Sequence, residues 1–181
     1  MTDPIDVLLE DHRQIMVPIH NLRRVVESLA SRGDAALPEA RSVLGEAALM
    51  MTTRLLEHAH KEDEALFPAL ERSFASNSGP TAVMREEHRE IEARAQLFKR
   101  TLHQLEHVEH PAILAGGSEL RAMASGEGDA AQIAALAREL IDLLDAHFSK
   151  EETILFPMAR QMLSADDLAA VGRRMDALRA V

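Results

Sequence analysis

The chain has 181 residues, a length that suits one domain with a single hydrophobic core. Hydrophobic residues make up 46% and charged residues 28%, a balance that excludes an intrinsically disordered chain. The formal net charge of −10 predicts no nucleic-acid partner, because phosphate binding requires a basic surface. The chain shows neither a signal-peptide pattern nor the roughly 20 apolar residues of a membrane span. We therefore expect no membrane association and, by default, a cytoplasmic protein.

Apolar residues recur in steps of three and four along five segments, the spacing of amphipathic helices. Good helix formers dominate and aromatic residues make up only 3%, so an all-α fold is predicted. Four long helices are expected, and they start at Pro4, near Pro38, at Pro80 and near residue 130. Gly33 is expected to end the first helix, and a Gly-punctuated connection, with room for a short helical piece within it, is expected at 111–129.

Long helices joined mostly by short connections predict an up-down-up-down antiparallel four-helix bundle. A short fifth helix is predicted at about 164–180, capped by Ser164 and Asp167 and packed across one end. We expect a single domain over residues 1–181, with the bundle core at about 3–160.

Six ionisable side chains fall on the apolar stripes of these helices: His12, His58, Glu62, His88, His147 and Glu151. Burying an unpaired carboxylate costs several kcal/mol, and no Lys or Arg lies on the stripes to neutralise the two glutamates. A multivalent metal ion would do so, with imidazole and carboxylate as its ligands in a chain that has no cysteine. In an antiparallel bundle the four histidines fall in roughly one cross-section.

The chain also repeats itself. "EDHRQI" at 10–15 matches "EEHREI" at 86–91, and "HAHKEDEALFP" at 58–68 matches "HFSKEETILFP" at 147–157. Each half therefore contributes one histidine and then a His-x-x-x-Glu pair, whose two members share one face of a helix. Two glutamates aimed at the centre can bridge two metal ions, which leaves two histidines for each ion. Leu-Phe-Pro is interpreted as structural, because proline bends or ends a helix.

Simpler roles are assigned to the other candidate ligands. Off the stripes, and expected on solvated helix faces, are His20, His60, Glu64 and Glu92. A cluster without a stripe acid, interpreted as a chance surface grouping, comprises His103, His107 and His110. Three methionines are interpreted as core filler: Met50, Met51 and Met84. A purely structural helical bundle with hydrogen-bonded core histidines stays open as an alternative.

The order and number of these motifs resemble the hemerythrin-like (HHE cation-binding) domain family, over about residues 3–160. The resemblance implies a non-haem di-iron centre with an oxo or hydroxo bridge and two bridging carboxylates. Carried over to this chain, His12 and His58 would hold one iron ion and His88 and His147 the other. Glu62 and Glu151 would bridge both ions. Zinc or manganese stays open, because the ligand types alone do not select the metal.

Oxygen-carrying members of this family have a fifth histidine one turn from the third-helix histidine, where this chain has Met84 and Glu92. The resemblance therefore implies a more symmetric centre that binds or reacts with dioxygen, peroxide or nitric oxide. Its setting would be oxidative or nitrosative stress or iron handling. A sensor of iron or oxygen, or a storage module without turnover, is the alternative, and the sequence does not decide whether the protein is an enzyme.

Metal-bound histidines usually hydrogen-bond an acceptor through their second ring nitrogen. The acids beside the first and third histidines are candidates for this role: Glu10, Asp11, Glu86 and Glu87.

Overall fold

The computed structural model describes the backbone of residues 2–115 and 129–178, and side chains except those of 105–115. Its helices are α1 (Pro4–Arg32), α2 (Leu37–Met51), α3 (Arg54–Lys61), α4 (Phe67–Phe74), α5 (Pro80–Ala115), α6 (Asp129–Lys150), α7 (Phe156–Met162) and α8 (Ala165–Leu178). Three shorter helical segments join them: η1 (Gly33–Ala36), η2 (Glu62–Leu66) and η4 (Glu151–Leu155). No strand occurs in the described backbone, so the all-α prediction is confirmed.

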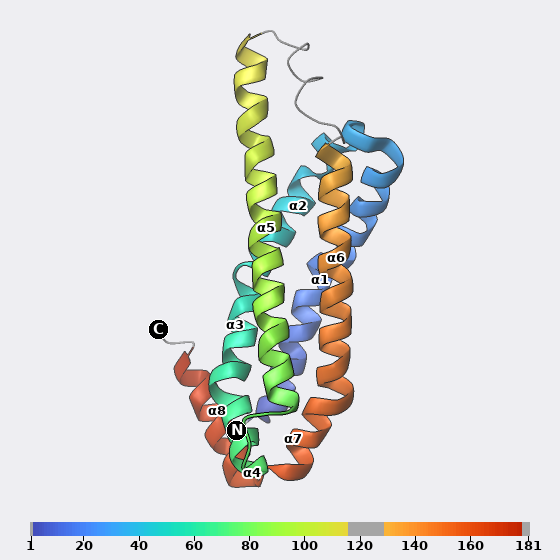
Figure 1. Ribbon diagram of the computed structural model, residues 1–181. Coiled ribbons are helices and arrows are strands. Elements are labelled where there is room, and N and C mark those ends of the chain that lie inside the picture. Colours follow the sequence, from blue (N-terminus) through green and yellow to red (C-terminus); the bar gives the residue numbers. More distant parts are fainter. Residues whose placement is uncertain (1, 116–128, 179–181) are drawn as a thin grey trace.

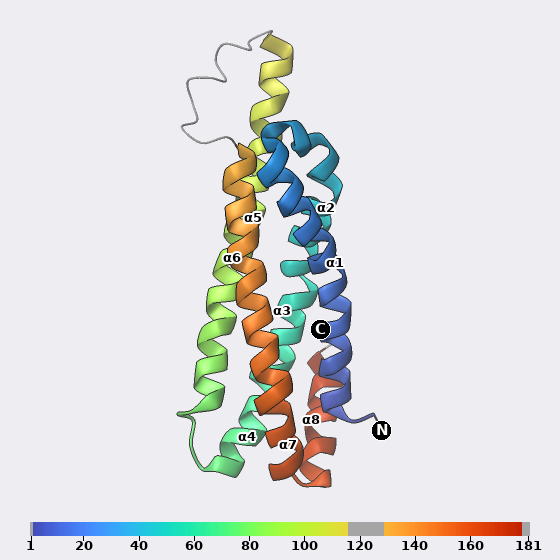
Figure 2. The same cartoon turned by 90° about the vertical axis from the view of Figure 1, so that its right-hand side faces the viewer.

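The long helices lie side by side, and the chain passes back and forth along the length of the molecule (Figures 1 and 2). Helix α1 packs against α2 and α6, and α5 packs against α6 and α2. Helices α4, α7 and α8 lie together at the end that also holds the N-terminus. No helix in the described part of the chain is apolar over a length that could cross a membrane.

Helix α1 begins and ends where the sequence predicts. The Ile5 backbone N–H donates to the Asp3 carboxylate at 2.9 Å, and Pro4 follows the cap as the first helical residue. Gly33 ends the helix with φ of +59°, a left-handed value that glycine adopts without a steric penalty. The start of α8 is also confirmed, because the backbone N–H groups of Ser164 and Asp167 each donate to the other's side chain at 3.2 Å.

The predicted continuous second helix is wrong at one point, because it divides into α2 and α3 at Thr52–Thr53. The Thr52 hydroxyl donates to the Ala48 carbonyl at 2.8 Å, and the Thr53 hydroxyl donates to the Leu49 carbonyl at 2.7 Å. Such bonds compete with the regular helical pattern, and Thr53 leaves helical geometry with φ of −128° and ψ of −83°. The apolar stripe nevertheless continues across the break, since Met51 and Leu55 are both buried.

The predicted start of the long connection, at residue 111, is also wrong. The backbone of α5 stays helical through Pro111 to Ala115, where helix-favouring residues follow the proline. The rest of the predicted connection, residues 116–128, lies outside the described residues, as do the side chains of His107 and His110.

Two clusters of buried apolar side chains fill the interior. The larger cluster lies between α1, α2, α5 and α6 and includes Leu22, Leu44 and Phe98. The smaller cluster lies at the end formed by α4, α7 and α8 and includes Leu8, Phe67 and Phe156. The stripes were therefore assigned to the correct helix faces.

We expect Leu22→Ala to lower the free energy of unfolding by about 2–5 kcal/mol, because it leaves a cavity in the larger cluster. The Leu22 side chain has 0% exposure, whereas Leu49 is 62% exposed and gives a matched control. Leu49→Ala should change stability by less than about 0.5 kcal/mol. Urea denaturation of the metal-free protein measures both, and equal losses in the two variants would contradict the packing described above.

Candidate metal centre

The six predicted ligands form a polar layer between the two apolar clusters. On α1 this layer lies between Leu8 and Ile15, and on α5 it lies between Met84 and Ile91. The exposed fraction of these six residues ranges from 0% for Glu62 and Glu151 to 7% for His88. The structure therefore brings together all six residues that the sequence singles out; their role as ligands stays a prediction.

One half of the layer contains His12, His58 and Glu151, whose donor atoms lie within 4.8 Å of one another. The Nε2 atoms of the two rings are 3.0 Å apart, and the Nε2 atom of His12 is 3.1 Å from the Glu151 Oε2 atom. Two unprotonated imidazole nitrogens at this distance repel each other, so a proton or a metal ion has to lie between them.

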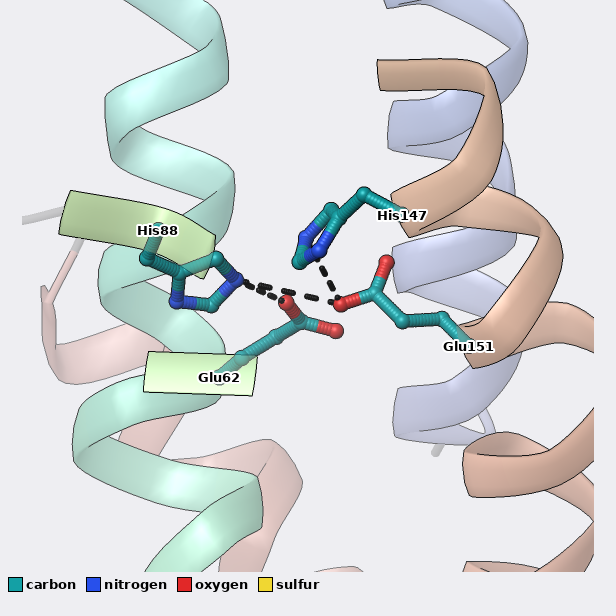
Figure 3. Close-up of side chains that lie close together, drawn as sticks. All are labelled: Glu62, His88, His147 and Glu151. Atoms are coloured by element: carbon teal, nitrogen blue, oxygen red, sulfur yellow. Dashed lines mark ion pairs between the residues drawn. The ribbon is translucent and has the colours of Figure 1, made fainter. Parts of the chain in front are cut away.

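The other half contains Glu62, His88, His147 and Glu151, which point toward one another from separate helical segments (Figure 3). The His147 Nε2 atom is 3.1 Å from the Glu151 Oε1 atom, and the His88 Nε2 atom is 3.3 Å from the Glu62 Oε2 atom. Glu151 thus presents one oxygen to each histidine pair. Glu62 also lies between the pairs, because its Oε2 atom is 3.5 Å from the His58 Nε2 atom.

Both glutamates are the first residues of short π-helical segments, η2 and η4. The Phe67 backbone N–H donates to the Glu62 carbonyl, and the Phe156 N–H donates to the Glu151 carbonyl, each five residues back. A proline follows each phenylalanine, and it cannot donate the bond that would continue a regular α-helix. Such π-turns recur at functional sites, and here each one places a carboxylate in the layer.

The phenylalanines of the two Leu-Phe-Pro motifs cover the histidines. Phe67 stacks on His88 with ring centroids 5.6 Å apart, and Phe156 stacks on His12 at 5.4 Å. The structural interpretation of Leu-Phe-Pro is consistent with both contacts.

Each histidine also faces a second acidic side chain through its Nδ1 atom. Asp11 lies 3.6 Å from His58, and Glu87 accepts from His147 at 3.0 Å. These are two of the four acids that the sequence suggests. The other two, Glu10 and Glu86, pair instead with nearby arginines on the surface of their own helices.

We call the four acids that face the Nδ1 atoms the outer acids, and the sequence did not single out two of them. Asp63 accepts from the Nδ1 atom of His88 at 3.0 Å, and Glu152 accepts from the Nδ1 atom of His12 at 2.7 Å. Each directly follows its central glutamate, at the same place in the two copies of the repeat. That shared position is the signal that could have identified them.

Three of the four outer acids have a cationic partner. Lys61 lies 2.6 Å from Asp11, Arg85 lies 3.3 Å from Asp63, and Lys150 pairs with Glu87. In the described part of the chain no Lys or Arg is recorded beside Glu152, which is 46% exposed. The two central glutamates and the four outer acids give six carboxylates, and the three cations leave an excess of three negative charges when every carboxylate is ionised. Two divalent ions, with four positive charges, would more than offset this excess.

Several buried polar atoms of the layer have no hydrogen-bond partner in the described structure. They include both carboxylate oxygens of Glu62, both of Glu151, and the Nε2 atom of His88. Leaving such atoms unsatisfied costs about 1–3 kcal/mol each, and more when they are charged. They are oxygen and nitrogen donors that converge on common points, so the residues fit metal ions of the kind that carboxylate and imidazole bind.

Comparison with known proteins supports this reading. The family model for the hemerythrin HHE cation binding domain matches residues 3–109 and again residues 104–180. The chain belongs to this family. It is also 28% identical over 158 residues to a protein of Enterobacter sp. (strain 638) named iron-sulfur cluster repair protein YtfE. The match covers 87% of this chain but only 64% of that relative's length.

The side chains that the sequence assigns to other roles lie outside the polar layer. Exposed on the helix surfaces are His20, His60, Glu64 and Glu92. Buried in or beside the apolar clusters are Met50, Met51 and Met84. No further group of metal-binding side chains occurs among the residues that the structure describes.

Electrostatics in the metal-free layer favours the protonated forms of His58 and His88. Burial lowers the pKa of His58, but the charge of Glu62 and the nearby carboxylates of Asp11 and Glu151 together outweigh burial and raise this pKa to about 9. Burial likewise opposes the charge on His88, but hydrogen bonds led by Asp63 raise its pKa to about 11. Burial and the charge of Glu151 raise the pKa of Glu62. Burial also opposes ionisation of Glu151, but the imidazoles of His12 and His147, each 3.1 Å from one of its oxygens, lower its pKa well below the usual range.

We expect the metal-free protein to lose stability as the pH rises from 6.5 through about 9. The folded-state pKa of His58 is raised to about 9 from 6.5, so its contribution is complete below pH 6.5 and is lost as the pH approaches 9. The slope is about 1.4 kcal/mol per pH unit for each proton that the folded state retains.

Urea denaturation in the presence of a chelator, at several pH values, measures this slope. His58→Gln should flatten the profile, whereas His20→Gln, at an exposed position, should leave it unchanged. A stability that stays constant from pH 6.5 to 9 would contradict the assigned proton.

Proposed function

We propose that the layer holds two iron ions. His12 and His58 would bind one ion, and His88 and His147 the other, with Glu62 and Glu151 shared between them. The observation that carries the proposal is the position of Glu151, whose two oxygens each lie 3.1 Å from a histidine of a different pair. A carboxylate placed in this way can bridge two ions, and the unpartnered oxygens of Glu62 support the same arrangement.

Membership of the hemerythrin family and the name of the YtfE relative, an iron-sulfur cluster repair protein, support iron over other metals. Zinc and manganese accept the same ligands, so metal analysis decides between them. A pair of iron ions supplies electrons and coordination positions for dioxygen, peroxide or nitric oxide. The function that we propose is therefore a di-iron protein that binds or reacts with such a ligand in oxidative or nitrosative stress or in iron handling.

The chain's own residues have distinct parts in this function. Three of the outer acids, Asp63, Glu87 and Glu152, accept hydrogen bonds from Nδ1 atoms and so turn the Nε2 lone pairs of those rings toward the centre. The apolar clusters on either side limit the access of water, which strengthens every charge interaction inside the layer. The π-turns hold the two shared carboxylates in place.

We also propose that α1, the run α2–α4, α5 and the run α6–α7 act as the four members of an up-down-up-down bundle. These runs form one domain with α8, which packs on η2 and α1 beside the layer. This arrangement explains why a layer made from both copies of the repeat is complete within one chain.

The wild-type protein purified from iron-supplemented medium should contain two iron ions per chain. Glu151→Ala should retain fewer than one, because this residue serves both histidine pairs. Glu46→Ala, at an exposed position on α2, is the matched control and should retain both ions. Elemental analysis measures all three proteins; fewer than one metal ion in the wild type, or full occupancy in Glu151→Ala, would remove the proposal.

Peroxide distinguishes reaction from storage. The reduced protein should consume one equivalent of hydrogen peroxide per pair of iron ions, because two ferrous ions supply the two electrons that reduce peroxide to water. A near-ultraviolet absorption of oxidised, bridged iron should appear at the same time, and it should be absent from Glu151→Ala. If peroxide leaves the spectrum of the iron-loaded wild type unchanged, the protein is a sensor or storage module for iron and not a reactive centre.

A further inference from the structure

The two halves of the polar layer are related by an approximate two-fold symmetry, which exchanges the two copies of the sequence repeat. It relates the contact of Asp11 with His58 to that of Glu87 with His147. It also relates the contact of Asp63 with His88 to that of Glu152 with His12. The stacked pairs Phe67–His88 and Phe156–His12 follow the same exchange. Under this relation α1 corresponds to α5, and α3 corresponds to the end of α6.

The residue that follows the second histidine of each half breaks this symmetry. After His147 comes Phe148, whereas after His58 comes Ala59. Phe148 is buried and stacks on His12, with ring centroids 4.0 Å apart and an interplanar angle of 19°. The same ring lies 5.8 Å from His58 and also 5.8 Å from His147. Phe148 therefore lies against both histidines of one pair, stacked closely on His12, and against only one histidine of the other pair.

In this exchange Ala59 corresponds to Phe148, and His88 corresponds to His12. The alanine has only a methyl group, and it is half-buried where Phe148 is buried. Of the four central histidines His88 is also the most exposed, at 7%, compared with 1–2% for the other three. In the described structure the only non-histidine ring recorded against His88 is Phe67, whereas His12 lies between Phe148 and Phe156.

We propose that small ligands reach the ion held by His88 and His147, from the side of Ala59, and that Phe148 shields the ion held by His12 and His58. This inference rests on the proposed di-iron function and adds which of the two ions takes the ligand. A three-atom anion or a diatomic molecule is the class of ligand that fits, because a methyl group in place of a phenyl ring frees only a small space. Ala59 and Phe148 are thus positions that control access; neither supplies a ligand atom.

Azide binding to the oxidised, iron-loaded protein tests the proposal by stopped-flow absorption. Ala59→Phe should retain two iron ions and should slow azide association at least tenfold. Ala135→Phe adds the same ring at an exposed site on α6 and should leave the rate unchanged. The double variant Ala59→Phe/Phe148→Ala moves the small residue to the other half, so the rate should recover.

Phe148→Ala gives a second readout that does not depend on adding a ring. It should raise azide binding from one to two equivalents per pair of iron ions. The proposal is overturned if Ala59→Phe, with two ions in place, binds azide at the wild-type rate. If Ala59→Phe fails to load iron, the smaller substitution Ala59→Leu replaces it in this comparison. It is also overturned if Phe148→Ala still binds one equivalent. A wild-type protein that holds no metal would instead overturn the proposed function itself.

Discussion

The structure depends on one constraint: two fully buried carboxylates need positive charge beside them. Glu62 and Glu151 lie between two apolar clusters, where each ionised group loses several kcal/mol of hydration. Surrounding histidines can offset this loss only if they carry protons or hold cations. The raised pKa values of His58 and His88 show that protons do so in the metal-free layer. Metal ions and protons therefore compete for the same positions, and metal binding has to release protons.

The outer acids link this requirement to the packing of the helices. Asp11 on α1 contacts a histidine on α3, and Asp63 at the start of η2 contacts one on α5. Glu87 on α5 contacts a histidine on α6, and Glu152 in η4 returns to α1. These four contacts form a closed circuit around the bundle. Movement of any helix would therefore turn at least two imidazole rings, which makes the geometry of the site a property of the whole helical assembly.

Periodicity in the sequence was sufficient to place the six central residues, because a helical stripe states directly which side chains face inward. It was also sufficient for the all-α fold and for the caps of α1 and α8. It did not reveal the break at Thr52–Thr53, since the stripe continues across it while side-chain hydrogen bonds change the backbone. Nor could it identify Asp63, because contacts of a residue off the stripe depend on how neighbouring helices are rotated.

The repeat predicts a symmetric centre, yet the structure departs from symmetry in two independent ways. Phe148 stacks on His12 in one half, whereas the other half has Ala59 at the matching position of the repeat. Arg85 neutralises Asp63, but the corresponding position on α1 is Leu9, and the described structure shows no cation beside Glu152. A carboxylate without a cationic partner draws more strongly on the imidazole proton, which makes the ring a stronger electron donor. Both departures therefore distinguish the same half of the layer, the half that contains His12.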